Sequence, residues 1–229
     1  MGLFDKKYCD VCGERIGLLG NRKLEDGNLC KDCARKLSPW FSERRNSSVN
    51  EIKRQLEYRE ENRGRVEAFH ITRTLGSGTK LLLDEDAGLF MVTSAKNIAE
   101  ANPDVLALSD VTGCTLDVEE SSKELLHEDK DGNEVSYNPP RYEYSYDFYI
   151  IVNVNNPYFN EMRFRINPNS VEISPPPSIR PGVTLRFNPE TNAEYKKYKQ
   201  LGEEIRQILV KVRDDVREKI EQAAAPKTA

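Results

Sequence analysis

Histidine and long apolar stretches are both scarce in this chain of 229 residues. Its two histidines, His70 and His127, have no serine or cysteine beside them in the sequence. No pairing of a nucleophile with a base can be identified, so we expect no catalytic residues. No apolar run approaches the about 20 residues that span a bilayer, and the opening residues MGLFDK lack the basic and apolar regions of a secretion signal. These absences predict a cytoplasmic, non-catalytic protein.

Charge is distributed unevenly, although the net charge is only −4. Residues 1–50 contain ten basic and seven acidic side chains, and residues 51–68 contain five of each. Residues 69–188 contain ten basic against eighteen acidic side chains, and residues 189–229 contain nine against eight. The acidic middle of the chain argues against a nucleic-acid or anionic-membrane footprint there.

Four of the five cysteines form two Cys-x-x-Cys pairs, Cys9 with Cys12 and Cys30 with Cys33. Two such pairs can occupy all four positions around a tetrahedral ion, which predicts one structural zinc ion. Iron or a redox pair is the alternative interpretation. With four cysteine ligands, no position stays open for a water nucleophile. Cysteine pairs of this kind also fit a reducing compartment. The fifth cysteine, Cys114, is predicted to be a small buried hydrophobe.

The residues around these cysteines predict a zinc finger over residues 1–45. Gly13 permits a tight turn after Cys12, Asp26-Gly27 indicates a hairpin, and CKDCARKL indicates a helix start. This order of knuckle, hairpin and helix resembles a treble-clef zinc finger. Fewer than about 40 residues cannot be stabilised by burial alone. We expect an apolar cap made of Ile16, Leu18, Leu24, Leu29, Leu37 and Trp40.

The predicted finger also offers a second interpretation, because it is rich in basic side chains. Nucleic-acid binding would use this basic edge, with Tyr8 and Trp40 as stacking groups. Four thiolates and one zinc dication contribute a charge of −2, which weakens this alternative. The basic residues concerned are Lys6, Lys7, Arg15, Arg22, Lys23, Arg35 and Lys36.

Residues 46–67 predict a charged helical connector. Possible N-caps precede a run whose apolar stripe is thin, formed by Val49, Ile52, Leu56 and Val66. We expect a mostly solvated helix, and a helix that docks a partner is the alternative.

Residues 68–174 predict a β-domain, because the apolar pattern changes to a period of two. We expect six to eight short strands, with a polar loop at Asp131-Gly132. The strongest strand is RYEYSYDFYIIVNVNN. We interpret its alternating residues as an aromatic core stripe in preference to a ligand site. They are Tyr142, Tyr144, Tyr146, Phe148, Ile150, Val152 and Val154.

The last part of the chain predicts a proline-rich linker at 175–188, an amphipathic helix at 189–222 and a disordered tail at 223–229. The apolar stripe of the helix must be buried, either on the sheet or against a second copy of the chain. This leaves a homo-oligomer possible. The stripe consists of Leu201, Ile205, Ile208, Leu209, Val212, Val216 and Ile220.

Two stretches resemble known families. YCDVCGERIGLLGNRKLEDGNLCKDCARKLSPWF resembles the four-cysteine finger of an uncharacterised bacterial and phage family, a domain of unknown function. LLLDEDAGLFMVTS, followed by NPDVLALSDVTGCTLDVEE, is similar to bacterial pleckstrin-homology-like (PH-like) domains. That resemblance implies an α+β protein whose bent β-sandwich is closed by a C-terminal helix. It implies no activity, and the basic pocket of lipid-binding relatives has only Arg73 and Lys80 as counterparts here.

We therefore expect a non-catalytic interaction or adaptor protein that holds one structural zinc ion. The PH-like sheet would contact a protein partner, and the finger would provide a second docking surface. The alternatives are a nucleic-acid-associated regulator that uses the finger, and association with a membrane surface through the PH-like domain.

Overall fold

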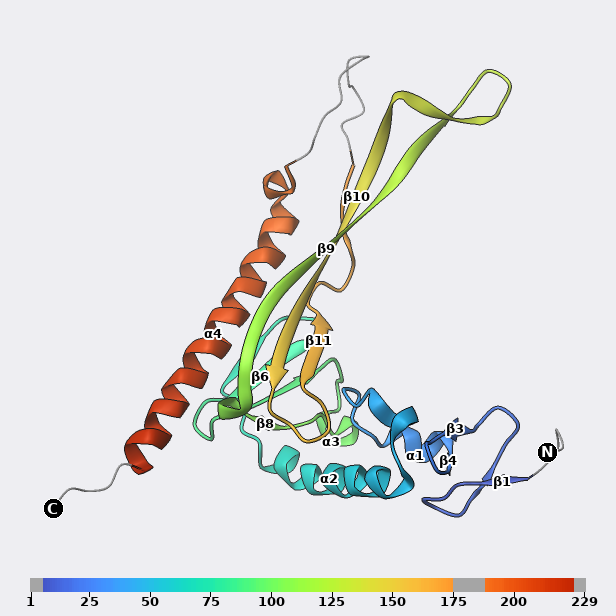
Figure 1. Ribbon diagram of the computed structural model, residues 1–229. Coiled ribbons are helices and arrows are strands. Elements are labelled where there is room, and N and C mark those ends of the chain that lie inside the picture. Colours follow the sequence, from blue (N-terminus) through green and yellow to red (C-terminus); the bar gives the residue numbers. More distant parts are fainter. Residues whose placement is uncertain (1–5, 175–187, 225–229) are drawn as a thin grey trace.

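The computed structural model describes residues 6–174 and 188–224, and it combines helices with antiparallel sheets (Figure 1). The N-terminal part consists of two small hairpins and a short helix. A 3-10 helix and the long helix α2 follow it. The elements are β1 (Lys7–Tyr8), β2 (Arg15–Ile16), β3 (Arg22–Lys23), β4 (Asn28–Leu29), α1 (Lys31–Arg35), η1 (Glu43–Asn46) and α2 (Val49–Ala68).

Two four-stranded antiparallel sheets form the body. The first has the order β5-β6-β7-β8, and in the second β10 pairs with β9, β11 and β12. The elements are β5 (Arg73–Leu75), β6 (Lys80–Asp84), β7 (Leu89–Thr93), α3 (Ile98–Ala101), β8 (Leu106–Ala107), η2 (Leu108–Asp110), β9 (Val111–Glu128), β10 (Glu134–Val154), β11 (Glu161–Arg165) and β12 (Val171–Ile173).

Both sheets contribute to one apolar core. Leu81 and Phe90 from the first sheet lie in the same cluster as Phe148 and Ile150 from the second, and all four are fully buried. Burial of this apolar area is the main favourable term in folding the body. The alternation predicted for β10 is confirmed where the strand crosses this core: every second residue from Tyr146 to Val154 is buried.

The prediction of short strands is wrong for β9 and β10, which have 18 and 21 residues. They pair as one hairpin whose distal end projects beyond the rest of the body (Figure 1). Tyr142, on the core-facing side of β10, is 39% exposed because it lies on this projection. The predicted aromatic core stripe therefore ends near Tyr144.

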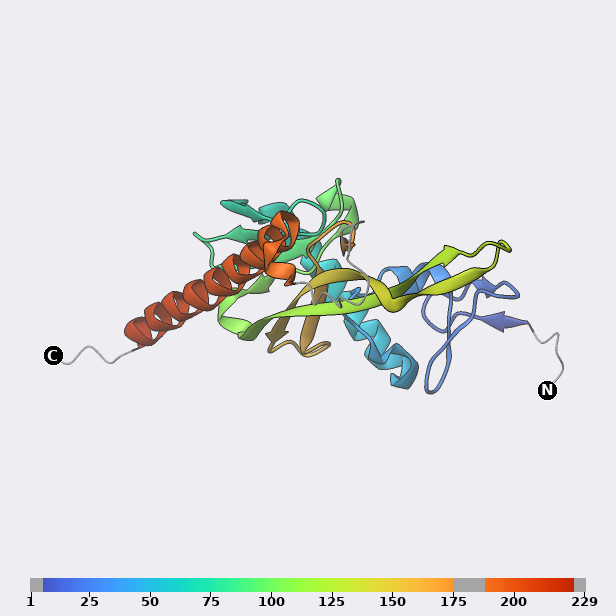
Figure 2. The same ribbon diagram turned by 90° about the horizontal axis from the view of Figure 1, so that it is seen from above.

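Helix α4 (Ala193–Ala224) follows η3 (Pro189–Thr191) and lies along β9 (Figures 1 and 2). Ile205 and Leu209 are fully buried in the main core, so the stripe of α4 caps the sheet over this part of its length. Tyr195 joins it, with its ring centroid 5.0 Å from those of Tyr146 and Phe148. A Cβ on Gly202 would lie 2.5 Å from Leu116 Cδ1, so glycine permits this close approach of helix and sheet.

The last turns of α4 extend past the sheets (Figure 2). The helix ends at Ala224, two residues beyond the predicted end. Residues 225–229 of the predicted tail lie outside the described residues. The same holds for the predicted linker at 175–188, except for Asn188 at its end. No helix in the described ranges is long and apolar enough to cross a membrane.

Candidate metal centre

The first cysteine pair lies in a turn between β1 and β2. Cys9 donates its N–H to the carbonyl of Glu14 at 2.9 Å, and Gly13 donates to the carbonyl of Cys9 at 2.8 Å. Gly13 has a φ of 77°, a conformation that glycine adopts without steric cost. The predicted knuckle is therefore present, and it points the side chains of Cys9 and Cys12 toward the second pair.

The second pair follows the hairpin β3–β4. Leu24 donates to the carbonyl of Gly27 at 2.9 Å and closes the turn predicted at Asp26-Gly27. Cys30 is the N-cap of α1, and its sulfur accepts from the N–H of Cys33 at 3.3 Å. The helix start thus carries Cys30 and Cys33 as the sequence predicts.

Asp10 joins the two halves of the finger. Its carboxylate accepts the N–H of Asn28 at 2.6 Å, while its own N–H donates to the carbonyl of Asn28 at 2.9 Å. A Cβ on Gly27 would lie 2.7 Å from Asp10 Oδ2, so a side chain there would disturb this link. Asp10 was not among the predicted site residues, because nothing in the sequence distinguishes it from an exposed acid.

The four sulfur atoms of Cys9, Cys12, Cys30 and Cys33 all lie within 4.8 Å of one another. The Sγ atoms of Cys12 and Cys30 are 3.8 Å apart. Thiolates bound about 2.3 Å from a tetrahedral zinc ion would lie about 3.8 Å from each other. The chemistry of the donors and their spacing therefore fit a metal ion held by four thiolates.

Backbone N–H groups favour the charged form of these sulfurs. The N–H of Cys30 donates to Cys9 Sγ at 3.3 Å. Burial raises the pKa of Cys9, but the N–H groups of Cys12, Cys30 and Val11 act in the opposite direction and lower that pKa to about 7. Burial raises the pKa of Cys33 far above its ordinary value. A thiol of this kind loses its proton readily only when a cation takes the proton's place.

The apolar cap of the finger differs from the predicted one at two positions. Leu18 is 91% exposed, because it lies in the turn that joins the two hairpins. Trp40 packs against the main core of the body instead. Their place is taken by Ile52 of α2, which is fully buried against the finger. The confirmed cap residues are Ile16, Leu24, Leu29 and Leu37.

The hairpin of the finger also holds the start of α2. Asp26 Oδ1 accepts the N–H of Val49 at 2.7 Å. Ser48 and Glu51 form a reciprocal capping box at the same helix end. Together these bonds satisfy N–H groups that a helix start otherwise leaves unpaired.

Most of helix α2 is exposed, as its sequence predicts, but one face buries polar side chains. Arg59 Nη1 lies 2.8 Å from Asp104 Oδ1, and the two side chains are 7% and 0% exposed. Ser38 donates its hydroxyl to Asp104 Oδ2 at 2.8 Å. Burial raises the pKa of the Asp104 carboxyl, although Arg59 beside it acts in the opposite direction.

The turn after α3 supplies further partners for this face. Asn102 has a φ of 48°, which asparagine tolerates better than most residues. It accepts from Arg59 through its carbonyl and donates its side-chain amide to the carbonyl of Arg59 at 2.8 Å. Asn62 is 1% exposed and bonds both Asn102 Oδ1 and the carbonyl of Pro103. The buried side chains of Arg59, Asn62, Asn102 and Asp104 are tolerated here because each has a hydrogen-bond partner. Gln55, buried on the same face of α2, has no hydrogen-bond partner for its side-chain amide among the described residues.

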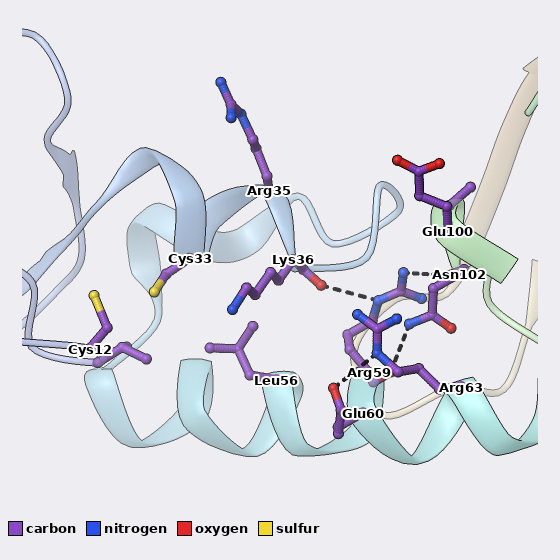
Figure 3. A pocket seen from close by; sticks show the side chains of 12 residues that line it. Cys12, Cys33, Arg35, Lys36, Leu56, Arg59, Glu60, Arg63, Glu100 and Asn102 are labelled. Carbon is purple, nitrogen blue, oxygen red and sulfur yellow. Dashed lines mark hydrogen bonds and ion pairs between the residues drawn. The ribbon is translucent and has the colours of Figure 1, made fainter. Parts of the chain in front are cut away.

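A cleft of about 320 Å³ lies between the finger, α2 and α3 (Figure 3). Cys12 and Cys33 lie at one end of the view, and the guanidinium groups of Arg59 and Arg63 lie at the other. Arg63 pairs with Glu60 at 3.0 Å. Arg35, which also lines the cleft, pairs with Asp32 at 3.2 Å. Of the predicted basic edge, Arg35 is thus paired with one of the protein's own carboxylates.

The remaining chemically notable residues lie apart from this centre. His70 is exposed, with Nδ1 3.9 Å from a carboxylate oxygen of Asp86. The ring of His127 contacts that of Tyr137 in the projecting hairpin in a tilted arrangement, with ring centroids 4.6 Å apart. Cys114 is 7% exposed in the main core, as predicted, and burial raises its pKa to about 11.

Comparison with known proteins identifies only the N-terminal part of the chain. Residues 7–55 match the family model of a domain of unknown function, DUF4428. The match contains all four cysteines and extends into α2 as far as Gln55, so it includes Ile52. No curated protein and no solved structure matches the chain.

The close approach at Gly27 generates a first prediction. Gly27→Ala is expected to destabilise the metal-saturated protein by about 1–3 kcal/mol, because the new Cβ would lie 2.6 Å from Val49 Cγ2. Gly17→Ala is the matched control, since a Cβ there meets nothing within 4 Å. Thermal unfolding of both variants checks this expectation, and an equal Tm for the two would contradict it.

The buried ion pair generates a second prediction. Asp104→Asn is expected to cost about 3–5 kcal/mol of unfolding free energy, because it leaves the Arg59 charge buried without a counter-charge. Glu60→Gln removes the partner of Arg63 from a pair whose side chains are 48% and 76% exposed, and should cost about 0–1 kcal/mol. Urea denaturation compares the two variants. Similar losses of unfolding free energy in the two variants would contradict the expectation that the buried pair contributes more than the exposed one.

Proposed function

We propose that residues 7–55 form a structural zinc module of the treble-clef type. The order of a knuckle at β1–β2, a hairpin at β3–β4 and the helix α1 supports this assignment. The observation that supports a metal ion is the closeness of the four sulfurs, which lie within 4.8 Å of one another, with 3.8 Å between Cys12 and Cys30. Zinc is the choice because closed four-cysteine sites in small modules of this order are typical structural zinc sites.

In this proposal the role of the ion is to stabilise the finger. When bound, it supplies the cross-links that the small apolar cluster around Leu24 and Leu29 cannot supply alone. Cys9 and Cys33 are part of that same cluster, so the thiolates and the apolar side chains order one another. Four cysteines leave no open coordination position, which argues for a non-catalytic site.

We further propose that the body is a PH-like domain. Two antiparallel sheets enclose one core, and the C-terminal helix α4 closes it through Ile205 and Leu209. Arg73, one of the two basic residues near the first loop, pairs with Glu85 at 3.1 Å. A pocket for an anionic lipid headgroup is therefore disfavoured, and contact with protein is favoured.

The function that this arrangement supports best is that of a non-catalytic adaptor. Helix α2 packs its first turns on the finger through Ile52 and bonds the body through Arg59 and Asn62. Because these contacts are buried, finger and body present their outer surfaces in a set orientation. An adaptor that engages a protein partner through two surfaces requires such an orientation.

The zinc proposal has a direct test in metal analysis of the freshly purified protein. About one equivalent of zinc is expected, and Cys30→Ser should lose most of it because only three thiolates remain. Cys114→Ala is the matched control and should keep the full content, since Cys114 lies in the main core. Less than about half an equivalent in the unaltered protein, or full zinc in Cys30→Ser, would contradict the proposal.

The adaptor proposal is tested by affinity capture with the full-length protein after nuclease treatment. We expect a protein partner that is retained by the unaltered chain and reduced with Cys30→Ser, because loss of the metal loosens the finger. Cys114→Ala again provides the control. Capture that disappears with nuclease would favour the basic edge of the finger as a nucleic-acid surface instead.

A further inference from the structure

A second concave surface lies at the junction between finger and body, lined by other residues than the cleft of Figure 3. This open groove has a volume of about 690 Å³ and runs between the segment that follows the finger and the turn between β10 and β11. Its aromatic and proline-containing lining is formed by Pro39, Trp40, Pro157, Tyr158 and Phe159.

Two aromatic rings of the groove are half-buried, so each offers part of its surface to a ligand. They are Trp40, the only tryptophan of the chain, and Tyr158. Tyr158 is held by neighbouring rings: its centroid lies 6.4 Å from that of Phe41 and 5.1 Å from that of Tyr58. Asn156 donates its amide to the Tyr58 hydroxyl at 3.2 Å. These contacts order the aromatic surface before any ligand arrives.

The charge along the groove is negative. Glu43 and Glu161 line it and are both exposed. The cation that also lines it, Arg163, is already engaged: its guanidinium lies 3.2 Å from Asp117, 2.7 Å from Glu119 and 3.5 Å from the centroid of the Tyr149 ring. Glu43 accepts the side-chain amide of Asn46 at 3.0 Å, but no ion pair within the described residues neutralises Glu43 or Glu161. Their charge therefore favours a basic ligand group over an anionic one.

The buried ion pair also positions this groove. Ser38 accepts the N–H of Trp40 at 3.1 Å, and the same hydroxyl donates to Asp104 at 2.8 Å. Asp104 is in turn held by Arg59. The backbone at Trp40 is thus tied to α2 and to the turn after α3. The other wall of the groove also contacts α2, because Asn156 and Tyr158 meet Tyr58 of that helix.

We propose that this groove binds a proline-rich peptide segment of a partner protein that carries an arginine or lysine beside its prolines. Such segments adopt an extended polyproline II helix before they bind, so little entropy is lost on docking, and their rings pack between aromatic side chains. The adjacent cation would pair with Glu43 and Glu161 at the rim. Stacked nucleotides are disfavoured, because their phosphates would meet the same carboxylates. The inference rests on the proposed adaptor function and names the chemical class of its partner.

The fluorescence of Trp40 reports on this groove, because it is the only tryptophan. We would titrate the full-length, zinc-loaded protein with a hexaproline peptide that ends in arginine. A saturable change in tryptophan fluorescence is expected. Hexaalanine ending in arginine and hexaproline ending in glutamate should each bind at least about tenfold more weakly, since they lack one half of the recognised chemistry.

Variants locate the binding. The double variant Glu43→Gln, Glu161→Gln should weaken binding of the arginine peptide about two- to thirty-fold, the range of two exposed ion pairs. Glu100→Gln is the matched control, because Glu100 lines the cleft of Figure 3 and not the groove. The variant Tyr158→Ala should no longer bind the peptide. Its zinc content should equal that of the unaltered protein, which checks that the finger of the variant is folded.

Three outcomes would overturn the proposal: no fluorescence change with the arginine peptide, equal binding of the two control peptides, or tighter binding of a single-stranded oligonucleotide. Failure here is distinguishable from failure of the adaptor function. A protein that contains zinc and captures a partner, but ignores the peptide, would lose the groove proposal alone. A protein without zinc and without a captured partner would lose the adaptor function itself.

Discussion

The ion pair between Arg59 and Asp104 is the interaction on which the rest of the structure depends. Its two charges are almost completely removed from water, which is costly unless every hydrogen-bonding group has a partner. Here the partners come from three separate parts of the chain: α2, the turn at Asn102 and the hydroxyl of Ser38. Because the pair is stable only when all three are present, it joins them in one arrangement.

This arrangement makes α2 a shared element of two structural parts. Its first half completes the finger, since Ile52 lies in the same apolar cluster as Cys9 and Cys33 of the candidate metal centre. Its last turn completes the body, since Val66 packs with Leu82, Met91 and Val105. The family match ends at residue 55, within this helix, so the recognised domain leaves out the part of α2 that bonds the body. Neither half of the helix would bury its apolar face alone.

The patterns that the sequence predicted well are those set by neighbouring residues. Cys-x-x-Cys spacing, the glycine after Cys12 and the alternation along β10 each reflect the geometry of a few consecutive residues. The predictions that failed concern contacts between distant segments. Leu18 looks like a cap residue by its chemistry alone, yet it lies in an exposed turn, while Trp40 packs on the body. The length of the β9–β10 hairpin was missed because a polar, projecting pair of strands carries little apolar alternation.

Local spacing was enough to predict the cluster of four cysteines, the mixed helical and antiparallel architecture and the amphipathic stripe of α4. The burial of Arg59 and Asn62 on a charged helix becomes visible only in the folded chain. Asp104 lies 45 residues from Arg59 and 66 residues from Ser38. From the sequence alone, a charged side chain such as Arg59 is expected at the surface, since burial of a charge without a partner is unfavourable. The folded chain places Asp104 beside Arg59, and through Ser38 the same contacts position the backbone of Trp40 at the groove.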